Sequence, residues 1–403
     1  MRFVIRMSEK MMKRDVLSQE YDYLGITDFP SPDYLILPIG KYVGNKKLVV
    51  GKKLRKYEEI IPGLISPVTG EIVEIAKIPV NGIESDVIRI RSEEEGSEED
   101  HIDVDPESEE TIEYLHQKLK GSGFFFKDEI GSKKDLIISA VDSDPLCSVS
   151  QQLLRENKKF LKEDFEKFKK IFNKRNIYFV VPEHLFDLVW ELQTYGINVC
   201  RISARYPNGI PEILVNSIAD NNVLDSPVFL KFEEFLNICR AAETGIPNFK
   251  KVVTVTDKNG IRNILVIKGT PLKFILKDSE LQAAGKVITG GPFRGYANYD
   301  LNSPVTDETE SIYVQYEKDI VRSVNDQCLN CGRCNNSCPV NLSVNMITRY
   351  SEFSIFEKCR DLGVENCIEC GLCSFNCPSG RSLVQLIKLA KSEIRGMEGE
   401  TTL

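Results

Sequence analysis

Two stretches near the end of the chain, CLNCGRCNNSCP (residues 328–339) and CIECGLCSFNCP (residues 367–378), decide how the C-terminal region folds. Each has the spacing C-x2-C-x2-C-x3-C-P, the pattern that binds a [4Fe–4S] cluster. Three closely spaced thiolates bind three irons of one cube, while the proline turn carries the fourth cysteine away. The two stretches therefore predict two [4Fe–4S] clusters in a C-terminal α-helical domain, residues 319–403.

The fourth cysteine of such a run ligates the other cluster, as in bacterial two-cluster ferredoxins. Each predicted ligand set therefore combines three cysteines of one run with one cysteine of the other. The first set is Cys328, Cys331, Cys334 and Cys377, and the second set is Cys367, Cys370, Cys373 and Cys338. The region is predicted to be a ferredoxin-type domain with two clusters.

Structural zinc is the alternative explanation for clustered cysteines. Zinc sites favour two thiolate pairs or mixed Cys/His sets in closed tetrahedral geometry. No histidine lies between residues 319 and 403, and two sets of four in triple C-x2-C steps fit zinc poorly. The spacing therefore favours iron–sulfur clusters.

The remaining cysteines and the histidines indicate no second site. Cys359 lies eight residues before the second run and is predicted to be buried in a helix, since free cysteine is among the most buried residue types. The same prediction covers Cys147, Cys200 and Cys239. His101, His116 and His184 are far apart and are predicted to lie on the surface or on helices. No catalytic residue is predicted, and one-electron transfer is the only chemistry indicated.

The composition is that of an ordinary globular chain. The 403 residues are 42% hydrophobic, and 52 basic against 60 acidic side chains give a formal net charge of −8. Eleven acidic residues, with no Lys or Arg among them, fall within residues 93–110 and predict a solvated acidic loop. The remainder is close to neutral and has no basic stripe, so nucleic-acid binding is disfavoured.

No targeting or membrane-spanning segment is visible in the sequence. No apolar stretch approaches the ~20 residues that a membrane-spanning helix needs, and the first residues lack the apolar core of a signal peptide. Cysteines that bind metal rather than form disulfides are typical of the reducing cytosol. We therefore expect a cytoplasmic protein that reaches the inner face of the cell membrane only through partner subunits.

Three further regions differ in their patterns. Residues 30–92 contain short β-branched runs broken by Gly, Pro and Asn, and predict an all-β module with a biotinyl-like barrel-sandwich hybrid fold. Residues 111–248 alternate strand-sized runs with helical patterns, including a helix at 184–195 that stops at Gly196, and predict a doubly wound, Rossmann-like α/β domain. Residues 249–316 predict a small β-rich module.

These regions, in this order, resemble the C subunit of the Rnf electron-transport complex. CIECGLCSFNCPSGRSLVQLIKLAKSEI (367–394) is similar to the second cluster segment of that family, ITGGPFRGYA (288–297) to its β-rich module, and SPVTGEIVEI (66–75) to its barrel-sandwich. The resemblance implies that residues 249–316 form an SLBB-type module. It also implies that the α/β domain resembles the flavin subunit of respiratory complex I, which holds FMN and NADH.

The flavin motifs of that family are altered in this chain. A glycine-rich loop under the flavin phosphate is represented by GSGFFFKDEIGS, which begins at Gly121, is shortened and carries three phenylalanines. Glycines let backbone N–H groups approach a phosphate closely, whereas bulky side chains obstruct this approach. The acids of the next motif correspond to Asp142 and Asp144, each one methylene shorter, while YPNG, beginning at Tyr206, matches. The resemblance therefore implies a retained fold with a degenerate pocket, in which FMN and NADH binding is disfavoured.

Two functions are consistent with these observations. In the first, the protein is an electron-transfer subunit that relays single electrons through two clusters in a redox complex. In the second, it is an NADH-oxidising FMN and iron–sulfur subunit, as the resemblance implies for typical members. The altered glycine loop favours the first function. The expected partners are other redox subunits or an electron carrier such as a ferredoxin, a flavoprotein or a reductase.

Overall fold

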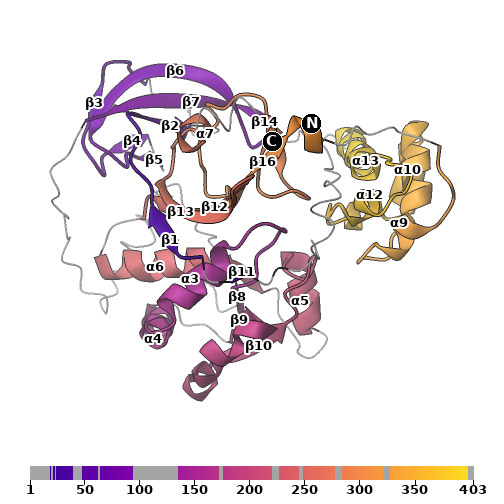
Figure 1. Ribbon diagram of the computed structural model, residues 1–403, viewed down its shortest axis with the longest axis horizontal. Coiled ribbons are helices and arrows are strands. Elements are labelled where there is room, and N and C mark those ends of the chain that lie inside the picture. Colours follow the sequence, from indigo (N-terminus) through magenta and orange to yellow (C-terminus); the bar gives the residue numbers. More distant parts are fainter. Residues whose placement is uncertain are drawn as a thin grey trace.

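The computed structural model describes residues 19, 21–22, 24–39, 48–61, 64–93, 135–171, 176–219, 227–244, 248–276, 284–320 and 327–397. Within these residues three sheet-containing parts lie together, and a helical C-terminal part projects from one side of them (Figure 1). In the described part of the chain, no helix is long and apolar enough to cross a membrane.

An antiparallel sheet forms from residues 34–92. In spatial order its strands are β2 (Tyr34–Pro38), β7 (Ile83–Ser92), β6 (Gly70–Val80) and β3 (Lys53–Leu54), and a hairpin of β4 (Glu59–Ile61) and β5 (Leu64–Ile65) packs with them. Ile72, Ile88 and Ile90 are fully buried between these strands. Alternate side chains of a strand point to the same face, so the short β-branched runs of the sequence place one apolar face inward.

A four-stranded parallel sheet forms the part drawn lowest in Figure 1. Its order is β10 (Asn198–Ile202), β9 (Ile177–Pro182), β8 (Leu136–Ser139) and β11 (Val228–Lys231). Helices α3 (Val149–Asn157), α4 (Leu161–Ile171) and α6 (Phe232–Thr244) cover one face, and α5 (Pro211–Ala219) covers the other. Because helices cover both faces, every residue of β9 is buried. The mixed α/β class predicted from the sequence is confirmed.

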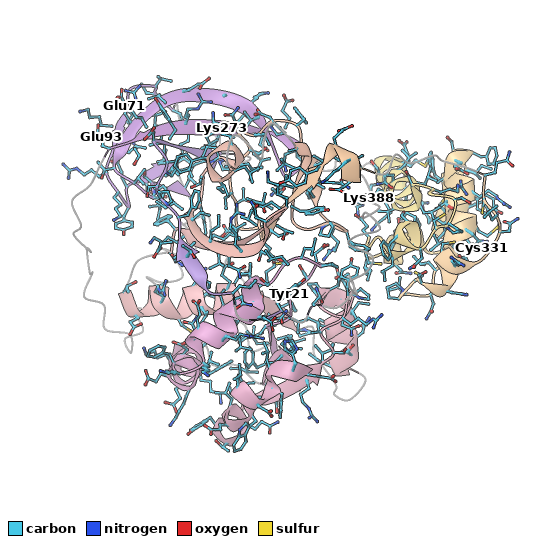
Figure 2. All side chains as sticks on the ribbon, in the orientation of Figure 1. Tyr21, Glu71, Glu93, Lys273, Cys331 and Lys388 are labelled. Carbon is cyan, nitrogen blue, oxygen red and sulfur yellow. The ribbon has the colours of Figure 1, made fainter. Side chains whose placement is uncertain are left out.

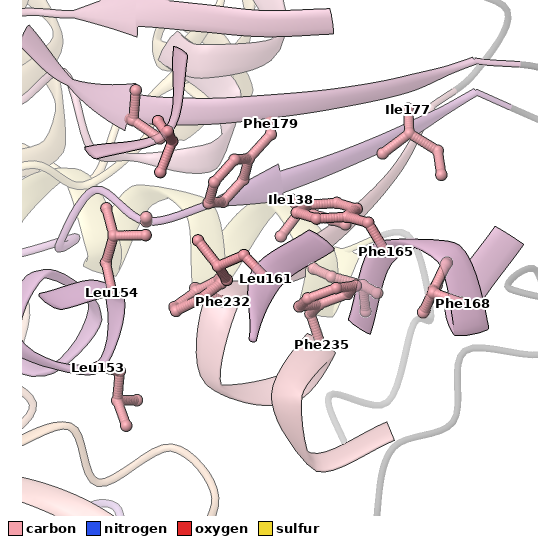
Figure 3. Packing of buried hydrophobic residues seen from close by; sticks show 14 of the residues in the cluster. Ile138, Leu153, Leu154, Leu161, Phe165, Phe168, Ile177, Phe179, Phe232 and Phe235 are labelled. Carbon is pink, nitrogen blue, oxygen red and sulfur yellow. The ribbon is translucent and has the colours of Figure 1, made fainter. Parts of the chain in front are cut away.

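Phenylalanines from two helices and a strand form the centre of this part (Figure 3). The Phe165 ring centroid lies 4.6 Å from that of Phe235 and 5.2 Å from that of Phe179. Aromatic pairs at such separations contribute about 0.5–1.5 kcal/mol beyond the area they bury. This packing holds α4 and α6 against strand β9 of the sheet.

The predicted helix at residues 184–195 is wrong in detail. The structure has two 3-10 helices there, Glu183–Leu188 and Trp190–Tyr195, separated at Val189. The predicted end is present, because Gly196 adopts a left-handed conformation with φ of 71°. The spacing of apolar residues in this segment is compatible with an α-helix and with a 3-10 helix. Short helical segments are often of the tighter 3-10 type.

A six-stranded mixed sheet lies between the other two sheets. Its order is β1 (Ile26–Asp28), β13 (Gly260–Ile267), β12 (Lys250–Asp257), β16 (Ser311–Tyr316), β14 (Ala284–Thr289) and β15 (Tyr296–Asn298), and α7 (Leu272–Ile275) packs on it. Strand β1 pairs in parallel with β13, with Ile26 opposite Asn263. It precedes residue 30, where the sequence predicts the first module to begin, so this strand was not predicted.

The C-terminal part consists of short helices around a small core. These are α9 (Arg333–Asn336), α10 (Val344–Glu352), α11 (Phe356–Asp361), α12 (Leu372–Phe375) and α13 (Leu383–Met397). Ile347, Ile387 and Ile394 are fully buried between them. The Ser351 hydroxyl on α10 donates to the Leu386 carbonyl of α13 over 2.7 Å, which joins the two longest of these helices.

Candidate iron–sulfur site

The two cysteine runs form two similar loops. Each cysteine of the first run is followed 39 residues later by its counterpart in the second, and α10 and α13 begin at equivalent positions. Gly332 precedes α9 with φ of 72°, and its counterpart Gly371 precedes α12 with φ of 79°. Glycine adopts this left-handed conformation without strain, so each loop turns sharply before its short helix. The turn brings the third cysteine of each run back toward the first two.

The first predicted ligand set surrounds one cavity. Cys328, Cys331 and Cys334 line it together with Cys377 from the other run. The cavity holds about 390 Å³ of empty space including its mouth, and Asn345, Thr348 and Arg381 also line it. Cys331 is exposed, and Figure 2 shows it at the outer end of the helical part, away from the sheets.

The second predicted ligand set surrounds the other cavity. Cys367, Cys370 and Cys373 line it together with Cys338 from the first run. This cavity holds about 300 Å³ of empty space including its mouth, and its other walls include Val340, Val344 and Ile387. Cys370 and Cys373 are buried, unlike any cysteine of the first set. The structure therefore brings each set of four thiols together, with the exchange of the fourth cysteine between the runs.

The geometry of both sets suits a cluster rather than a single ion. Among the described residues, no three Cys, His, Asp or Glu side chains meet closely enough to share one metal ion. The thiols of each set stand around a cavity, as ligands at the corners of a cube do, whereas zinc ligands converge on one point at about 2.0–2.3 Å. The residues present therefore fit two [4Fe–4S] cubes.

Burial changes the protonation of the second set. It raises the pKa of the Cys370 thiol to about 11 and raises the pKa of the Cys373 thiol further. Only thiolates ligate iron, so the positive charge of the metal is needed to hold these sulfurs deprotonated. Backbone N–H groups assist, because Glu369 N–H donates to Cys367 Sγ over 3.4 Å and Leu342 N–H donates to Cys338 Sγ over 3.3 Å.

Charged side chains lie beside both cavities. Arg381 lines the first cavity, is 7% exposed, and forms an ion pair with Glu352 at the end of α10. Beside the second cavity, Lys391 of α13 donates to the Cys367 carbonyl over 2.9 Å and pairs with Glu369 over 3.2 Å. The cysteine spacing did not identify Arg381, Glu352 or Lys391, because only the folded helices bring them to the ligand loops.

Residues of the altered flavin motifs meet beside the second set. The Tyr206 hydroxyl donates to the Cys370 carbonyl, and the Tyr206 ring lies 4.9 Å from that of Phe293. The Asp144 carboxylate accepts hydrogen bonds from the backbone N–H groups of Phe293, over 3.1 Å, and Arg294, over 2.8 Å. A Cβ atom at Gly291 would lie 2.3 Å from the Asp144 carboxylate, so only glycine permits this approach. These motifs join the α/β part, the six-stranded sheet and the second cysteine run.

The second altered acid is also engaged within the protein. Asp142 accepts hydrogen bonds from the Ser150 N–H and the Gln151 amide, each over 2.8 Å. Burial raises the pKa of Asp142 to about 7, although these hydrogen bonds oppose the rise. The glycine-poor loop that begins at Gly121 lies outside the described residues.

A half-buried and a buried ion pair lie at the carboxyl edge of the parallel sheet. Lys231, the last residue of β11, pairs with Glu310, which also accepts from the Ser143 hydroxyl over 2.9 Å. Lys251 of β12 pairs with Glu233 over 2.7 Å. Strand order changes direction between β8 and β11, and α/β proteins commonly bind ligands at such an edge. Here side chains of the protein itself fill this position.

Of the four cysteines outside the two runs, some are buried as predicted and some are not. Cys359 on α11 and Cys239 on α6 are buried, and Cys359 Sγ donates to the Ile347 carbonyl over 3.3 Å. Cys147 is buried in a loop rather than a helix. Cys200 lies on strand β10 and is half-buried, so the predicted burial is wrong for this residue. His184 is exposed, and His101 and His116 lie outside the described residues.

Comparisons with known proteins identify relatives of both the cluster region and the longer chain. A family model described as "4Fe-4S dicluster domain" matches residues 320–378. Over 164 residues the chain is 38% identical to the C subunit of the "Ion-translocating oxidoreductase complex" of Methanosarcina acetivorans, covering 40% of this chain and 37% of that protein. The protein of the same name from Vibrio cholerae is 25% identical, covering 90% of this chain and 52% of that protein.

A further relative matches along nearly its whole length. The C subunit of the "Proton-translocating ferredoxin:NAD(+) oxidoreductase complex" of Clostridium ljungdahlii is 24% identical, covering 91% of this chain and 89% of that protein. Among solved structures, a chain of an NAD+-reducing [NiFe]-hydrogenase gives a TM-score of 0.41 at 9% identity, covering 73% of this chain and 63% of that chain. The chain spans about a third to a half of the length of the first relatives it matches.

Proposed function

We propose that the chain belongs with the C subunits of ion-translocating oxidoreductase complexes that it resembles, and that it is an electron-transfer subunit of a redox complex. It relays single electrons through two [4Fe–4S] clusters. The observation that carries this proposal is the gathering of eight cysteines into two sets of four around two cavities. The match of residues 320–378 to a 4Fe-4S dicluster domain supports it.

The chain's own residues have three tasks in this function. The eight thiolates hold the clusters, which supply one-electron redox chemistry when bound. The exchange of Cys338 and Cys377 between the runs ties both cluster loops into one small core, so their separation is fixed. The apolar walls at Val340, Val344 and Ile387 exclude water from the second cavity.

We also propose a fold for each of the other regions. In this proposal residues 30–92 form a barrel-sandwich module, 111–248 a Rossmann-like domain, 249–316 an SLBB-type module and 319–403 the ferredoxin-type domain. The acidic loop predicted at 93–110 lies, beyond residue 93, outside the described residues. The sheets described above support this division. Together they present the cluster domain to its partners, which are other redox subunits or an electron carrier. The protein is cytoplasmic in this proposal and contacts the inner face of the membrane through partner subunits.

The second candidate function is oxidation of NADH through FMN held in the α/β part. The name of the Clostridium ljungdahlii relative, which includes NAD+, favours it. The hydrogen bonds of Asp142 and Asp144 within the protein weigh against it, as do the ion pairs at the edge of the parallel sheet. Electron relay without bound flavin is therefore the preferred function.

Metal analysis and spectroscopy of the whole chain test this proposal. Protein purified and reconstituted without oxygen should contain about eight irons and eight acid-labile sulfides, as expected for two cubes. It should take up about two electrons on reduction and return them to a ferredoxin or flavoprotein acceptor. Zinc in place of iron, or clusters that reduction does not change, would refute the proposal.

Two matched variants serve as controls. Cys328→Ala should lose iron from the first cluster, because this thiol lines the first cavity. Cys359→Ala should keep the full iron content, because this buried thiol contacts the Ile347 carbonyl and lines neither cavity. Equal iron loss in both variants would indicate misfolding rather than lost ligands.

A further inference from the structure

A lysine is buried beside the second ligand set. Lys391 is only 9% exposed. Lysine is almost never buried without a partner, and this one has two. Its ammonium donates to the carbonyl of Cys367 over 2.9 Å and lies 3.2 Å from a carboxylate oxygen of Glu369. Both contacts are to the loop that runs from Cys367 to Cys370. The charge is therefore held against the ligands of one cluster.

The negative charge of Glu369 is shared between two lysines, so it does not fully neutralise Lys391. Its other carboxylate oxygen pairs with Lys388 over 3.1 Å, so one carboxylate faces two lysines. Lys388 lies one helical turn before Lys391 on α13, and Figure 2 shows it on the side of the helical part that faces the sheets. The group formed by Lys388, Lys391 and Glu369 therefore has a net positive charge.

The first cluster loop has the opposite charge at the equivalent place. Thirty-nine residues before Lys391, at the same position of the preceding repeat, stands Glu352 at the end of α10. Glu352 pairs with Arg381, which neutralises it. The counterpart of Glu369 is Asn330, whose side-chain oxygen accepts from Arg349 over 3.2 Å. The repeat thus keeps the fold of both loops and a basic residue at Arg349 and Lys388, but it reverses the charge at the position of Glu352 and Lys391.

Reduction of a cluster adds one negative charge to it. A fixed positive charge nearby stabilises the reduced form more than the oxidised form, and a buried charge is little screened by solvent. Reduction potentials of such clusters respond to the net charge, hydrogen bonds and solvent exposure around the sulfurs. Lys391 meets these conditions for the second cluster. At the first cluster the buried cation is Arg381, which contacts the Cys328 side chain and pairs with Glu352.

We propose that Lys391 is a positioning residue that raises the reduction potential of the cluster held by Cys367, Cys370, Cys373 and Cys338. The lysine touches the ligand loop and acts on the cluster through its charge. This inference rests on the proposed function, since it requires that both clusters are present and reducible. It assigns a specific role to a side chain that lies outside both cysteine runs.

Redox titration of the reconstituted whole chain, followed by EPR, tests the proposal. The signal of the second cluster is assigned as the one that Cys367→Ala removes. Lys391→Gln should shift the midpoint potential of this cluster to a more negative value and leave that of the first cluster unchanged. Lys391→Arg, which keeps the charge, should restore the wild-type value. Lys358→Gln removes an exposed lysine from α11 and should shift neither potential.

Glu369→Gln provides a test of opposite sign. Removing its negative charge should shift the second midpoint potential to a more positive value. An unchanged potential in Lys391→Gln, or an equal shift in Lys391→Arg, would overturn the inference. If Lys391→Gln does not retain its cluster, absence of a positive shift in Glu369→Gln overturns it. A wild-type chain without two reducible clusters would instead refute the proposed function, and the inference with it.

Discussion

The hydroxyl of Tyr206 donates a hydrogen bond to the backbone carbonyl of Cys370. This contact joins two segments that are 164 residues apart in the chain, one from the α/β part and one from the second cysteine run. Phe293 of the six-stranded sheet completes the joint, since its ring packs 4.9 Å from that of Tyr206 and 5.2 Å from that of Phe375. The cluster region is therefore docked on the sheets through the second ligand set, while the first set faces away.

Removing this hydrogen bond should loosen the joint. Tyr206→Phe keeps the ring packing but leaves the Cys370 carbonyl without its donor, at an expected cost of about 1 kcal/mol in the free energy of unfolding. Chemical denaturation measures the loss, and hydrogen exchange of residues 367–375 should increase. Tyr299→Phe, at a side chain that is 85% exposed, should have no effect. Equal stability of both variants would contradict this role of Tyr206.

Exchange of the fourth cysteine between the runs predicts which cluster each variant affects. Cys338→Ala should perturb the cluster that Cys367, Cys370 and Cys373 bind, because Cys338 lines their cavity. The EPR signal that remains on reduction should match that of Cys367→Ala. If Cys338→Ala instead resembles Cys328→Ala, each run binds its own cluster and the proposed ligand sets are wrong.

Glu310 should be required for stability above acidic pH. Burial alone would raise its pKa, but Lys231 and Lys251 lower the pKa of this carboxyl to about 2. Glu310→Gln would leave Lys231, whose side chain is 35% exposed, without this charged partner. Because solvent screens part of the interaction, we expect a loss of about 1 kcal/mol in the free energy of unfolding. Thermal and chemical unfolding near pH 7 measure this loss.

The pH dependence of the same variant provides a second measurement. A carboxyl with a lowered folded-state pKa contributes stability above its unfolded value of 4.5, and this contribution is lost as the pH falls through about 2. The stability difference between wild type and Glu310→Gln should therefore be constant near neutral pH and shrink below pH 4.5. Glu308→Gln, at an exposed neighbouring position, is the control. A difference that does not depend on pH would contradict the ion pair.

The isolated chain should not bind FMN stoichiometrically or oxidise NADH. A flavin phosphate is a dianion whose burial requires several inward-facing N–H groups. Phe124, Phe125 and Phe126 stand in the corresponding loop, and Asp144 already accepts from two backbone N–H groups in the turn between β14 and β15. Flavin fluorescence titration and an NADH–ferricyanide assay are the measurements. Micromolar FMN affinity with turnover would make NADH oxidation the preferred function.

Elements with a local pattern were predicted well from the sequence. Strands β8 and β9 follow short continuous apolar runs, and the long helix α13 follows an apolar stripe with helical spacing. The element type failed at residues 184–195, where the pattern of apolar residues does not distinguish a 3-10 helix from an α-helix. Strand β1 was missed because three residues carry too little pattern, and its pairing with β13 is a contact with a distant part of the chain.

Contacts with distant parts of the chain also determine the segment before residue 30, and the sequence did not predict them. The Gln19 amide donates to the Asp142 carbonyl over 2.9 Å, and the Gln151 amide donates to the Gln19 carbonyl over 2.6 Å. The hydroxyl of Tyr21 accepts from the Leu146 N–H over 2.8 Å. These polar residues look like surface positions in the sequence. Only the fold gives them buried partners, because those partners lie more than 120 residues away.

The sequence by itself determined the cofactor class, because the spacing of cysteines within a dozen residues limits which metal groups they can surround. It also determined the order of sheet-rich and helical regions, since periodicity is a property of neighbouring residues. Only the tertiary structure decided that Tyr206 meets Cys370 and that the ammonium of Lys391 lies against the second ligand loop. Burial and charge proximity depend on how distant segments pack, and no spacing along the chain encodes them.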